Sequence, residues 1–362
     1  MTESRARLEM PEGGERAPLT QLFPVKRAWN LTAATGVGSL PGTSPIEAAA
    51  MVAGELPTLP HLVELPDRGV GADMVGRAIG MLVDIYGEVV PSGWRISRRP
   101  GRDTSRAKDF LSWDADAAQQ QFAGAEWIKV QVCGPWTLAA MLEVPSGHRA
   151  LTDFGAVDDI ATSLAEGLVA HITDIATRVP GAGIVVQIDE PSLPAVLTGN
   201  LPTASGFGTV PAVQAVRAID VLSRITDALG EHPSIAHCCH AAAPLRLFRA
   251  AGFDALSVDM TILGSTAAAL DPIGEAVETG AILLAGAVPS IAPANSRAPL
   301  KTWANPILQT WDRLGFPRQQ LASGVVPTPA CGLAGADREW ALRAMKLTAE
   351  LGQALQDLPE GW

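Results

Sequence analysis

Short apolar runs alternate with longer amphipathic stretches along most of the chain, and this alternation constrains the fold more than any other feature. Many of the runs are rich in Val and Ile, and between them apolar residues recur at three- and four-residue spacing. Strands that alternate with helices form parallel sheets, because each helix returns the chain to the same edge of the sheet. We count eight runs, which end near Ser39, Leu65, Val132, Asp189, His237, Asp259, Gly286 and Pro327.

Eight strand–helix units predict an α/β fold, namely a (β/α)8 TIM barrel. A doubly wound open sheet is the alternative, and it would leave the first and eighth strands unpaired. The helical spacing is clearest in five stretches, which are residues 44–55, 153–177, 210–229, 300–314 and 337–355. Residues 191–216 carry no charge but many Gly, Pro and Thr residues, which predicts a long loop over a site rather than a membrane helix.

The rest of the composition predicts one domain and limits the partners. No shift in composition divides the chain, so residues 29–362 are expected to form one barrel domain, after a short disordered extension at residues 1–28. The formal charge is −11, without a basic stripe, which argues against nucleic acid. Four cysteines, two of them adjacent, make no disulfide framework in a chain of 362 residues. We therefore expect a cytoplasmic protein with no membrane partner.

The sequence "HCCH" at residues 237–240 predicts a metal site. His237 and Cys239 are two residues apart at the end of a strand, so the alternation of strand side chains places both on one side. Cys331 follows the eighth run and Asp259 closes the sixth, and the carboxyl ends of barrel strands meet at one mouth. Imidazole, thiolate and carboxylate groups are all ligands of tetrahedral Zn²⁺. The predicted zinc ligands are His237, Cys239, Asp259 and Cys331.

A purely structural interpretation of these residues is the alternative. An isolated His-x-Cys pair is a weak signal, and buried cysteines often pack as small apolar side chains. Cys238 has the opposite parity and is expected to pack against the barrel wall, and Cys133 is also expected to be structural. His240 is predicted to be a loop or surface residue. A zinc finger would need a second close pair of ligands, which the sequence lacks.

Carboxylates and small residues at other strand ends predict a substrate site. Asp189 and Glu190 close the fourth run before Pro191, and one of them can face the mouth to hold a substrate ammonium group or to act as a base. A salt bridge to a neighbouring Arg is the alternative. Gly38 and Ser39 lie in a loop without the lysine of a P-loop, and their backbone N–H groups can bind a carboxylate.

Seven short motifs, taken together and in order, resemble one known family. It is the catalytic half of cobalamin-independent methionine synthase, a zinc (β/α)8 barrel related to uroporphyrinogen decarboxylase. The matched pieces extend from about residue 34 to residue 350, through most of the chain. They are "GVGSLPGT", "ELPDRGVGADMV", "VQVCGPWTL", "QIDEPSL", "HCC", "FDALSVD" and "VVPTPACGL".

The resemblance implies a chemistry for the residues that match. The family's zinc ligands fall on His237, Cys239, Cys331 and, where the family has glutamate, Asp259. Gly38 and Ser39 match the loop that holds the carboxylate of homocysteine, and Glu64 and Asp189 match the residues that hold its amino group. In the family, zinc binds the homocysteine sulfur as a thiolate, and a metal-bound thiol is deprotonated near neutral pH. The substrate itself then supplies the nucleophile.

Three departures from the family concern the methyl donor. Ala195 stands where the family has a second acid, and Pro289 and Ile291 lie in the loop that carries an Asp and a His in the family. Those groups are thought to protonate the folate leaving group, and the sequence shows no counterpart of the family's N-terminal half. The departures favour a methyl-corrinoid, either free methylcobalamin or a corrinoid protein, over methyltetrahydrofolate.

The sequence therefore predicts a zinc-dependent methyltransferase that methylates the thiol of homocysteine to give methionine, with Asp189 and Glu190 as candidate catalytic residues. One alternative is an alkyltransferase that acts on another thiol, such as coenzyme M. Another is a non-catalytic barrel that binds a small molecule. Zinc content distinguishes the enzymes from the last alternative.

Overall fold

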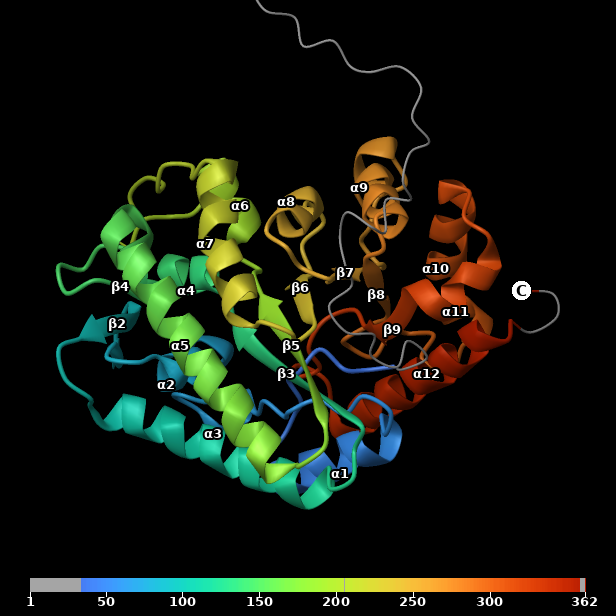
Figure 1. Ribbon diagram of the computed structural model, residues 1–362, viewed down its shortest axis with the longest axis horizontal. Helices are drawn as coiled ribbons and strands as arrows, with labels where there is room; N and C mark the ends of the chain where they lie inside the picture. Colours follow the sequence, from blue (N-terminus) through green and yellow to red (C-terminus); the bar gives the residue numbers. More distant parts are fainter. Residues whose placement is uncertain (1–33, 205, 359–361) are drawn as a thin grey trace, which may run out of the picture.

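The computed structural model describes residues 34–204, 206–358 and 362 and has an α/β barrel architecture (Figure 1). The extension predicted at residues 1–28 lies outside the described residues. Six parallel strands form the main sheet, in the order β3-β5-β6-β7-β8-β9. Their bounds are β3 (Trp127–Cys133), β5 (Gly183–Asp189), β6 (Ser234–Cys238), β7 (Ala255–Asp259), β8 (Ile282–Val288) and β9 (Val325–Pro329).

Two further extended segments join the edges of this sheet, so the predicted ring of eight is confirmed. His61 pairs in parallel with Lys129 of β3, and Ser39 pairs in parallel with Glu64. On the other side, the N–H of Thr35 donates to the carbonyl of Pro327 in β9 at 3.3 Å. These contacts connect the first predicted run to both the second and the eighth, which rules out the open sheet.

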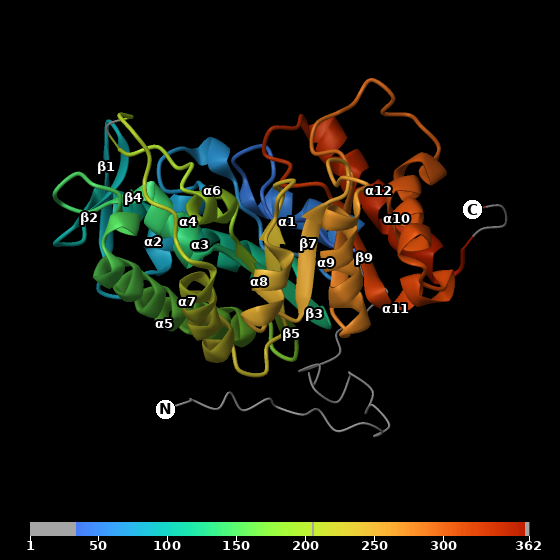
Figure 2. The same ribbon diagram turned by 90° about the horizontal axis from the view of Figure 1, so that it is seen from above.

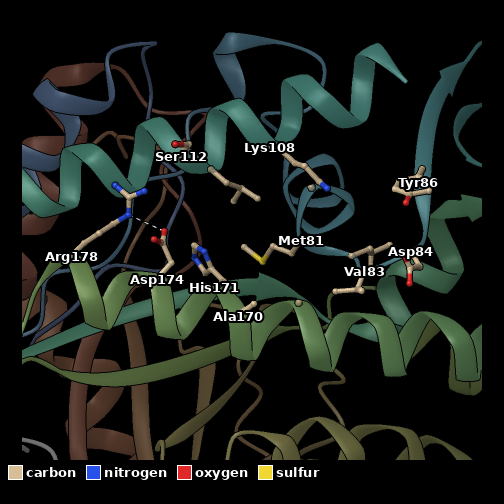
Figure 3. Close-up of a pocket in the computed structure, with 14 residues that line it drawn as sticks. Met81, Val83, Asp84, Tyr86, Lys108, Ser112, Ala170, His171, Asp174 and Arg178 are labelled. Atoms are coloured by element: carbon tan, nitrogen blue, oxygen red, sulfur yellow. Dashed lines mark hydrogen bonds and ion pairs between the residues drawn. The ribbon is translucent and has the colours of Figure 1, made fainter. Parts of the chain in front are cut away.

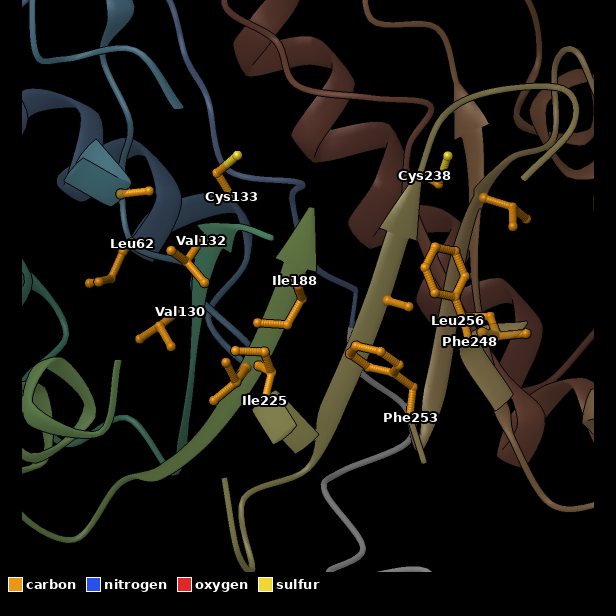
Figure 4. Packing of buried hydrophobic residues seen from close by; sticks show 14 of the residues in the cluster. Leu62, Val130, Val132, Cys133, Ile188, Ile225, Cys238, Phe248, Phe253 and Leu256 are labelled. Atoms are coloured by element: carbon orange, nitrogen blue, oxygen red, sulfur yellow. The ribbon is translucent and has the colours of Figure 1, made fainter. Parts of the chain in front are cut away.

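Apolar side chains lie on both faces of the strands, as a buried parallel sheet requires. Val185, Ile235 and Ala255 belong to a small cluster within the ring. Their chain neighbours belong to a larger cluster, which packs the outer face of the strands against the helices (Figure 4). The alternation therefore defines which strand residues point into the barrel and toward its mouth.

The helices surround the ring, and four of them begin and end within one residue of the predicted stretches. Ser44, Asp153 and Asp337 cap three of these helices by accepting hydrogen bonds from backbone N–H groups of the first turn. The α-helices are α1 (Pro45–Glu55), α2 (Met74–Met81), α3 (Arg102–Gln121), α4 (Pro135–Met141), α5 (Phe154–Arg178), α6 (Leu193–Thr198), α7 (Ala215–Ala228), α8 (Leu245–Ala250), α9 (Ala267–Glu278), α10 (Leu300–Leu314), α11 (Leu321–Gly324) and α12 (Arg338–Gln356). Short 3-10 turns lie at Pro66–Arg68, Ala150–Thr152 and Arg318–Gln320.

Two boundaries and one small sheet differ from the sequence prediction. The eighth run begins as the short helix α11, and only Val325–Pro329 is extended. Helix α7 starts at Ala215 rather than residue 210, because the N–H groups of Val210 and Val213 bond to carbonyls in the loop and at the end of α6. The prediction also missed a small sheet of β1 (Tyr86–Val90), β2 (Gly93–Ser97) and β4 (Leu142–Glu143), which lies at the end of the molecule away from α10 and α12 (Figure 2). Among the described helices, none is long and apolar enough to cross a membrane.

Candidate metal and substrate site

Three of the predicted metal ligands converge at the barrel mouth, and we call His237, Cys239 and Cys331 the thiol cluster. One ligand atom from each lies within 4.8 Å of the others. The two sulfur atoms are 3.0 Å apart, and the sulfur of Cys331 is 3.9 Å from Nε2 of His237. The cluster joins the ends of β6 and β9, which are 92 residues apart in sequence at the two cysteines.

Neighbouring side chains orient the thiol cluster. Nδ1 of His237 lies 2.9 Å from Oγ of Ser257 on β7, so a proton on Nδ1 leaves the lone pair of Nε2 directed at the sulfurs. The N–H of Cys331 donates to Oγ of Ser290 at 2.9 Å, which holds the loop after β9 against the loop after β8. Such contacts around a ligand set keep the ligands in place before a metal binds.

The donor set and spacing of the thiol cluster fit Zn²⁺. Ligand atoms of a tetrahedral zinc site lie about 3.5–3.8 Å apart, given metal–ligand bonds of about 2.0–2.3 Å. The separations of 3.0 and 3.9 Å lie on either side of that range, so small side-chain rotations complete the fit. Two thiolates and one imidazole leave a fourth position for a substrate atom, which is the pattern of catalytic zinc sites.

The predicted fourth ligand, Asp259, lies outside the thiol cluster. Its carboxylate turns back to its own loop and accepts hydrogen bonds from the N–H of Thr261 at 2.8 Å and from the Thr261 hydroxyl at 2.5 Å. The sequence correctly placed Asp259 at the end of β7. It did not predict that the Asp259 carboxylate would bond to the backbone of its own turn, which short acidic side chains often do.

The two sulfurs differ in proton affinity. Hydrogen bonds from Cys331 and then His237 lower the pKa of Cys239 to about 4. The same contact, with burial, raises the pKa of Cys331. The hydrogen bond from Cys331 therefore favours the thiolate form of Cys239, which is the form that a metal binds.

The adjacent carboxylates Asp189 and Glu190 point to different places. Glu190 is fully buried, and its oxygens accept hydrogen bonds from the N–H groups of Trp136 and Thr137 and from the Thr137 hydroxyl, at 2.7–2.9 Å. It therefore binds the first turn of α4 rather than facing the mouth. Asp189 pairs in register with His237, and its Oδ1 accepts a hydrogen bond from Gln187 at 2.7 Å. Burial raises the pKa of Asp189 to about 7, with His237 opposing the shift.

Glu64, which the sequence also selected, is a buried carboxylate at the mouth. One oxygen lies 3.6 Å from Nε of Arg77, whose guanidinium also pairs with Asp114. Asp114 in turn accepts two hydrogen bonds from Arg68, at 2.8 and 2.9 Å. Burial raises the pKa of Glu64, although Arg77 and Lys129 oppose the shift.

The Gly38–Ser39 loop lies between these groups and the thiol cluster. Ser39 pairs with Glu64 on one side, and its carbonyl accepts a hydrogen bond from Leu333, two residues after Cys331, on the other. Gly38 has φ of +155° and packs against Gln131, so an added Cβ would lie 2.9 Å from that side chain. The structure thus brings together the four residues predicted to bind the substrate, which are Gly38, Ser39, Glu64 and Asp189.

Sequence reasoning missed a buried lysine beneath these carboxylates. Lys129 points into the ring and donates hydrogen bonds to the carbonyl of Val37 at 2.9 Å and to Oε1 of Gln187 at 2.8 Å. Burial lowers the pKa of Lys129 to about 8, although Asp189 and Glu64 raise it. We call Glu64, Lys129 and Asp189 the carboxylate cluster. Polar residues at every second position of β3 and β5 were the available signal.

The three residues expected to be structural behave as predicted. Cys238 is buried at the end of β6 and Cys133 at the end of β3, where it is in register with Asp189, and both belong to the larger apolar cluster (Figure 4). Burial raises the pKa of both thiols, to about 12 for Cys238. His240 is exposed in the loop after β6, where its Nδ1 accepts a hydrogen bond from the N–H of Ala242.

A cavity of about 440 Å³ lies elsewhere, among α2, α3 and α5. His171, Tyr86 and Lys108 line it, together with the ion pair between Asp174 and Arg178 (Figure 3). Its walls come from the outer helices, the loop after α2 and the start of β1, and not from the ends of the barrel strands. It is therefore separate from the site at the mouth.

Comparisons with known proteins identify a matching family and a structure with a similar fold. The family model for "Cobalamin-independent synthase, Catalytic domain" matches residues 31–353. The B12-independent methionine synthase from Shewanella sp. W3-18-1, solved in complex with selenomethionine, is similar with a TM-score of 0.53 and 14% identity. The alignment covers 89% of this chain and 98% of that one.

Other comparisons add little. A GH5_18 structure from Streptomyces cattleya in complex with GlcNAc reaches a TM-score of 0.44 at 15% identity, and covers 90% of this chain and 81% of that one. A comparison with curated proteins gives no match.

Proposed function

Because the chain belongs to the family of cobalamin-independent synthase catalytic domains and is a methyltransferase, we propose that it methylates the thiol of homocysteine to give methionine. One observation carries the proposal. An imidazole and two thiols with the spacing of a zinc site lie beside a buried carboxylate, and Asp189 and His237 occupy paired positions on neighbouring strands. A small thiol with an amino group suits both neighbours at once.

In this proposal His237, Cys239 and Cys331 hold Zn²⁺. The metal, when bound, keeps the substrate sulfur as a thiolate near neutral pH. Asp189 and Glu64 hold the substrate ammonium group, and the backbone N–H groups of the Gly38–Ser39 loop hold its carboxylate. Three fixed contacts orient the sulfur toward the donor, so that a new S–C bond forms as the donor releases its methyl group.

Ser257 and Glu190 support the reacting groups without touching them. Ser257 fixes the imidazole of His237 in the orientation that the cluster needs. Glu190 binds α4 and is not proposed as a catalytic residue, because the hydrogen bonds of its carboxylate go to the first turn of that helix. Among the predicted catalytic residues, only Asp189 keeps a role at the substrate.

The sequence leaves two candidate methyl donors, methyltetrahydrofolate and a methyl-corrinoid. The family is described as cobalamin-independent, so the comparisons give no support for the corrinoid donor that Ala195, Pro289 and Ile291 suggested. Pro289 accepts a hydrogen bond from Trp340, and the exposed Ile291 lies close to Gly335, so neither supplies an acid at the mouth. We therefore keep methyltetrahydrofolate and methylcobalamin as the two donors to compare.

The experiment incubates zinc-loaded protein with homocysteine and, separately, each donor, and measures methionine. Methionine from either donor, lost in Cys239→Ser, supports the proposal. The absence of product from both donors, while zinc is bound at one equivalent, contradicts it. In that case coenzyme M becomes the next thiol to test, and an absence of bound zinc favours a non-catalytic barrel.

A further inference from the structure

Lys129 is fully buried within the barrel, at 0% exposure, and lies among carboxylates that the proposed function assigns to the substrate. Burying an ammonium group is costly unless hydrogen bonds and opposite charges compensate it. Among the described residues, its partners are a carbonyl and two amide oxygens rather than a carboxylate in direct contact. The position of this lysine therefore calls for a reason beyond a simple ion pair.

Gln187 connects Lys129 to Asp189 through one hydrogen bond at each end of its side-chain amide. A glutamine side chain has one acceptor end and one donor end. Lys129 takes the acceptor, because its Nζ lies 2.8 Å from Oε1 of Gln187. The donor end is thereby turned to Oδ1 of Asp189 at 2.7 Å and to the carbonyl of Val37 at 3.0 Å. Without the lysine, Oε1 of Gln187 loses its donor, and only the contacts of Nε2 with Asp189 and Val37 still hold the amide.

Gln131 makes the matching connection on the other side. Its Oε1 lies 3.4 Å from Nζ of Lys129, and its Nε2 donates to the carbonyl of Leu62 at 2.8 Å. Leu62 is two residues before Glu64, and Gly38 packs directly on the Gln131 side chain. Lys129 itself also donates to Val37, next to Gly38.

We propose that Lys129 is a positioning residue that, through Gln131 and Gln187, aligns Glu64, Asp189 and the Gly38 loop to recognise thiols that carry an α-ammonium group. This inference rests on the proposed function and deepens it, because it assigns the substrate class to one internal side chain. Lys129 lies below the mouth and does not touch the substrate. Its removal weakens recognition of the ammonium group and leaves the thiol cluster intact.

Two ligands separate these effects. Homocysteine carries the ammonium group, and γ-mercaptobutyrate is the same thiol acid without it. Calorimetry measures the affinity of both for zinc-loaded wild type, Lys129→Met and Gln187→Met, with exposed Lys108→Met as a matched control. We expect the dissociation constant for homocysteine to rise by about tenfold or more in the first two variants, as loss of hydrogen bonds to a charged group implies. The constant for γ-mercaptobutyrate and the zinc content stay at the wild-type level.

The outcomes distinguish this inference from the proposed function. A wild type that does not prefer homocysteine over γ-mercaptobutyrate contradicts the proposed function itself. A wild-type preference that survives in Lys129→Met, or a loss of affinity that is equal for the two ligands, contradicts the role of Lys129. If Lys129→Met does not fold, Gln187→Met gives the same test, because it removes the link to Asp189 and keeps the lysine.

Discussion

The thiol cluster and the carboxylate cluster meet at one barrel mouth, yet they are organised in different ways. Cys239 and Cys331 are only partly buried, and their sulfurs contact one another and the imidazole of His237. The carboxylate cluster is buried, and Lys129 and Asp189 reach one another through the fixed amide of Gln187. The carboxylate cluster is held by a buried hydrogen-bond network, whereas the sulfurs of the thiol cluster are partly exposed and held by fewer contacts.

This difference suggests that the carboxylate cluster determines substrate specificity and that the thiol cluster provides reactivity. A preorganised, buried set of charges gives specificity, because a ligand that lacks the matching group leaves polar atoms unpaired. A thiol set with an open position gives reactivity, because it activates whichever sulfur reaches the metal. The two halves should therefore respond independently to substitution, even though paired positions of β5 and β6 join them.

The largest effect is expected from the thiol cluster. Cys239→Ser should lose zinc and lower methyl transfer by at least about 100-fold, since a catalytic metal contributes several kcal/mol. Metal analysis and the methionine assay check this. Cys238→Ser is the control, because Cys238 packs in the outer core and should keep one equivalent of zinc. Equal zinc loss in both variants would refute the assigned ligand set.

The next effect concerns the carboxylate cluster alone. Asp189→Asn should raise the KM for homocysteine by about 10- to 100-fold, since it removes a charged partner of the ammonium group. The value of kcat and the zinc content should change little. Steady-state kinetics with homocysteine and γ-mercaptobutyrate check this. A proportional loss for both thiols would show that Asp189 does not recognise the amino group.

Glu190→Gln gives a sharper contrast between neighbouring residues. We expect the free energy of unfolding to fall by about 2–3 kcal/mol, because the N–H groups of Trp136 and Thr137 and the Thr137 hydroxyl lose a buried carboxylate acceptor. The KM for homocysteine should stay near that of the wild type in protein that remains folded. Denaturant unfolding and kinetics test both parts. A change in KM without a change in stability would place Glu190 at the substrate after all.

The smallest effect is a pH dependence of stability near the carboxylate cluster. Burial and then the charge of Lys129 lower the pKa of His61 from 6.5 to about 3, so the unfolded chain takes up this proton first. Stability from this group is complete above pH 6.5 and is lost as the pH falls. Between pH 7 and 5 the loss should be about 2 kcal/mol. Denaturant unfolding of His61→Gln should show a free energy of unfolding that depends less steeply on pH than in the wild type. An unchanged dependence would show that His61 is not held neutral in the folded protein.

The sequence predicted the barrel well because each strand carries its own signal. Apolar β-branched runs and period-two alternation are local, and the polar residues that follow them mark the mouth. The small sheet was missed because Tyr86–Val90 and Gly93–Ser97 follow one another with no helix between them, and so lie outside the strand–helix alternation. The late start of β9 was missed because the apolar run continues through Leu321–Gly324, where the chain is still helical.

The site was predicted in part, and the limits are physical. Parity placed His237 and Cys239 on one side, and the barrel rule brought Cys331 to them. The local turn that occupies Asp259 and the binding of Glu190 to α4 depend on side-chain rotamers and on contacts with other segments, which no strand pattern specifies. Lys129 was visible as a polar residue in a buried strand, but its role follows only from its partners.

In the proposed site, His237, Cys239 and Cys331 hold one zinc ion with a position open to the substrate sulfur. X-ray absorption at the zinc edge, measured on the loaded protein before and after addition of homocysteine, tests it most directly. We expect two sulfur neighbours at about 2.3 Å and one imidazole, and a third sulfur when homocysteine is added. A zinc shell without sulfur, or one that homocysteine leaves unchanged, would contradict it.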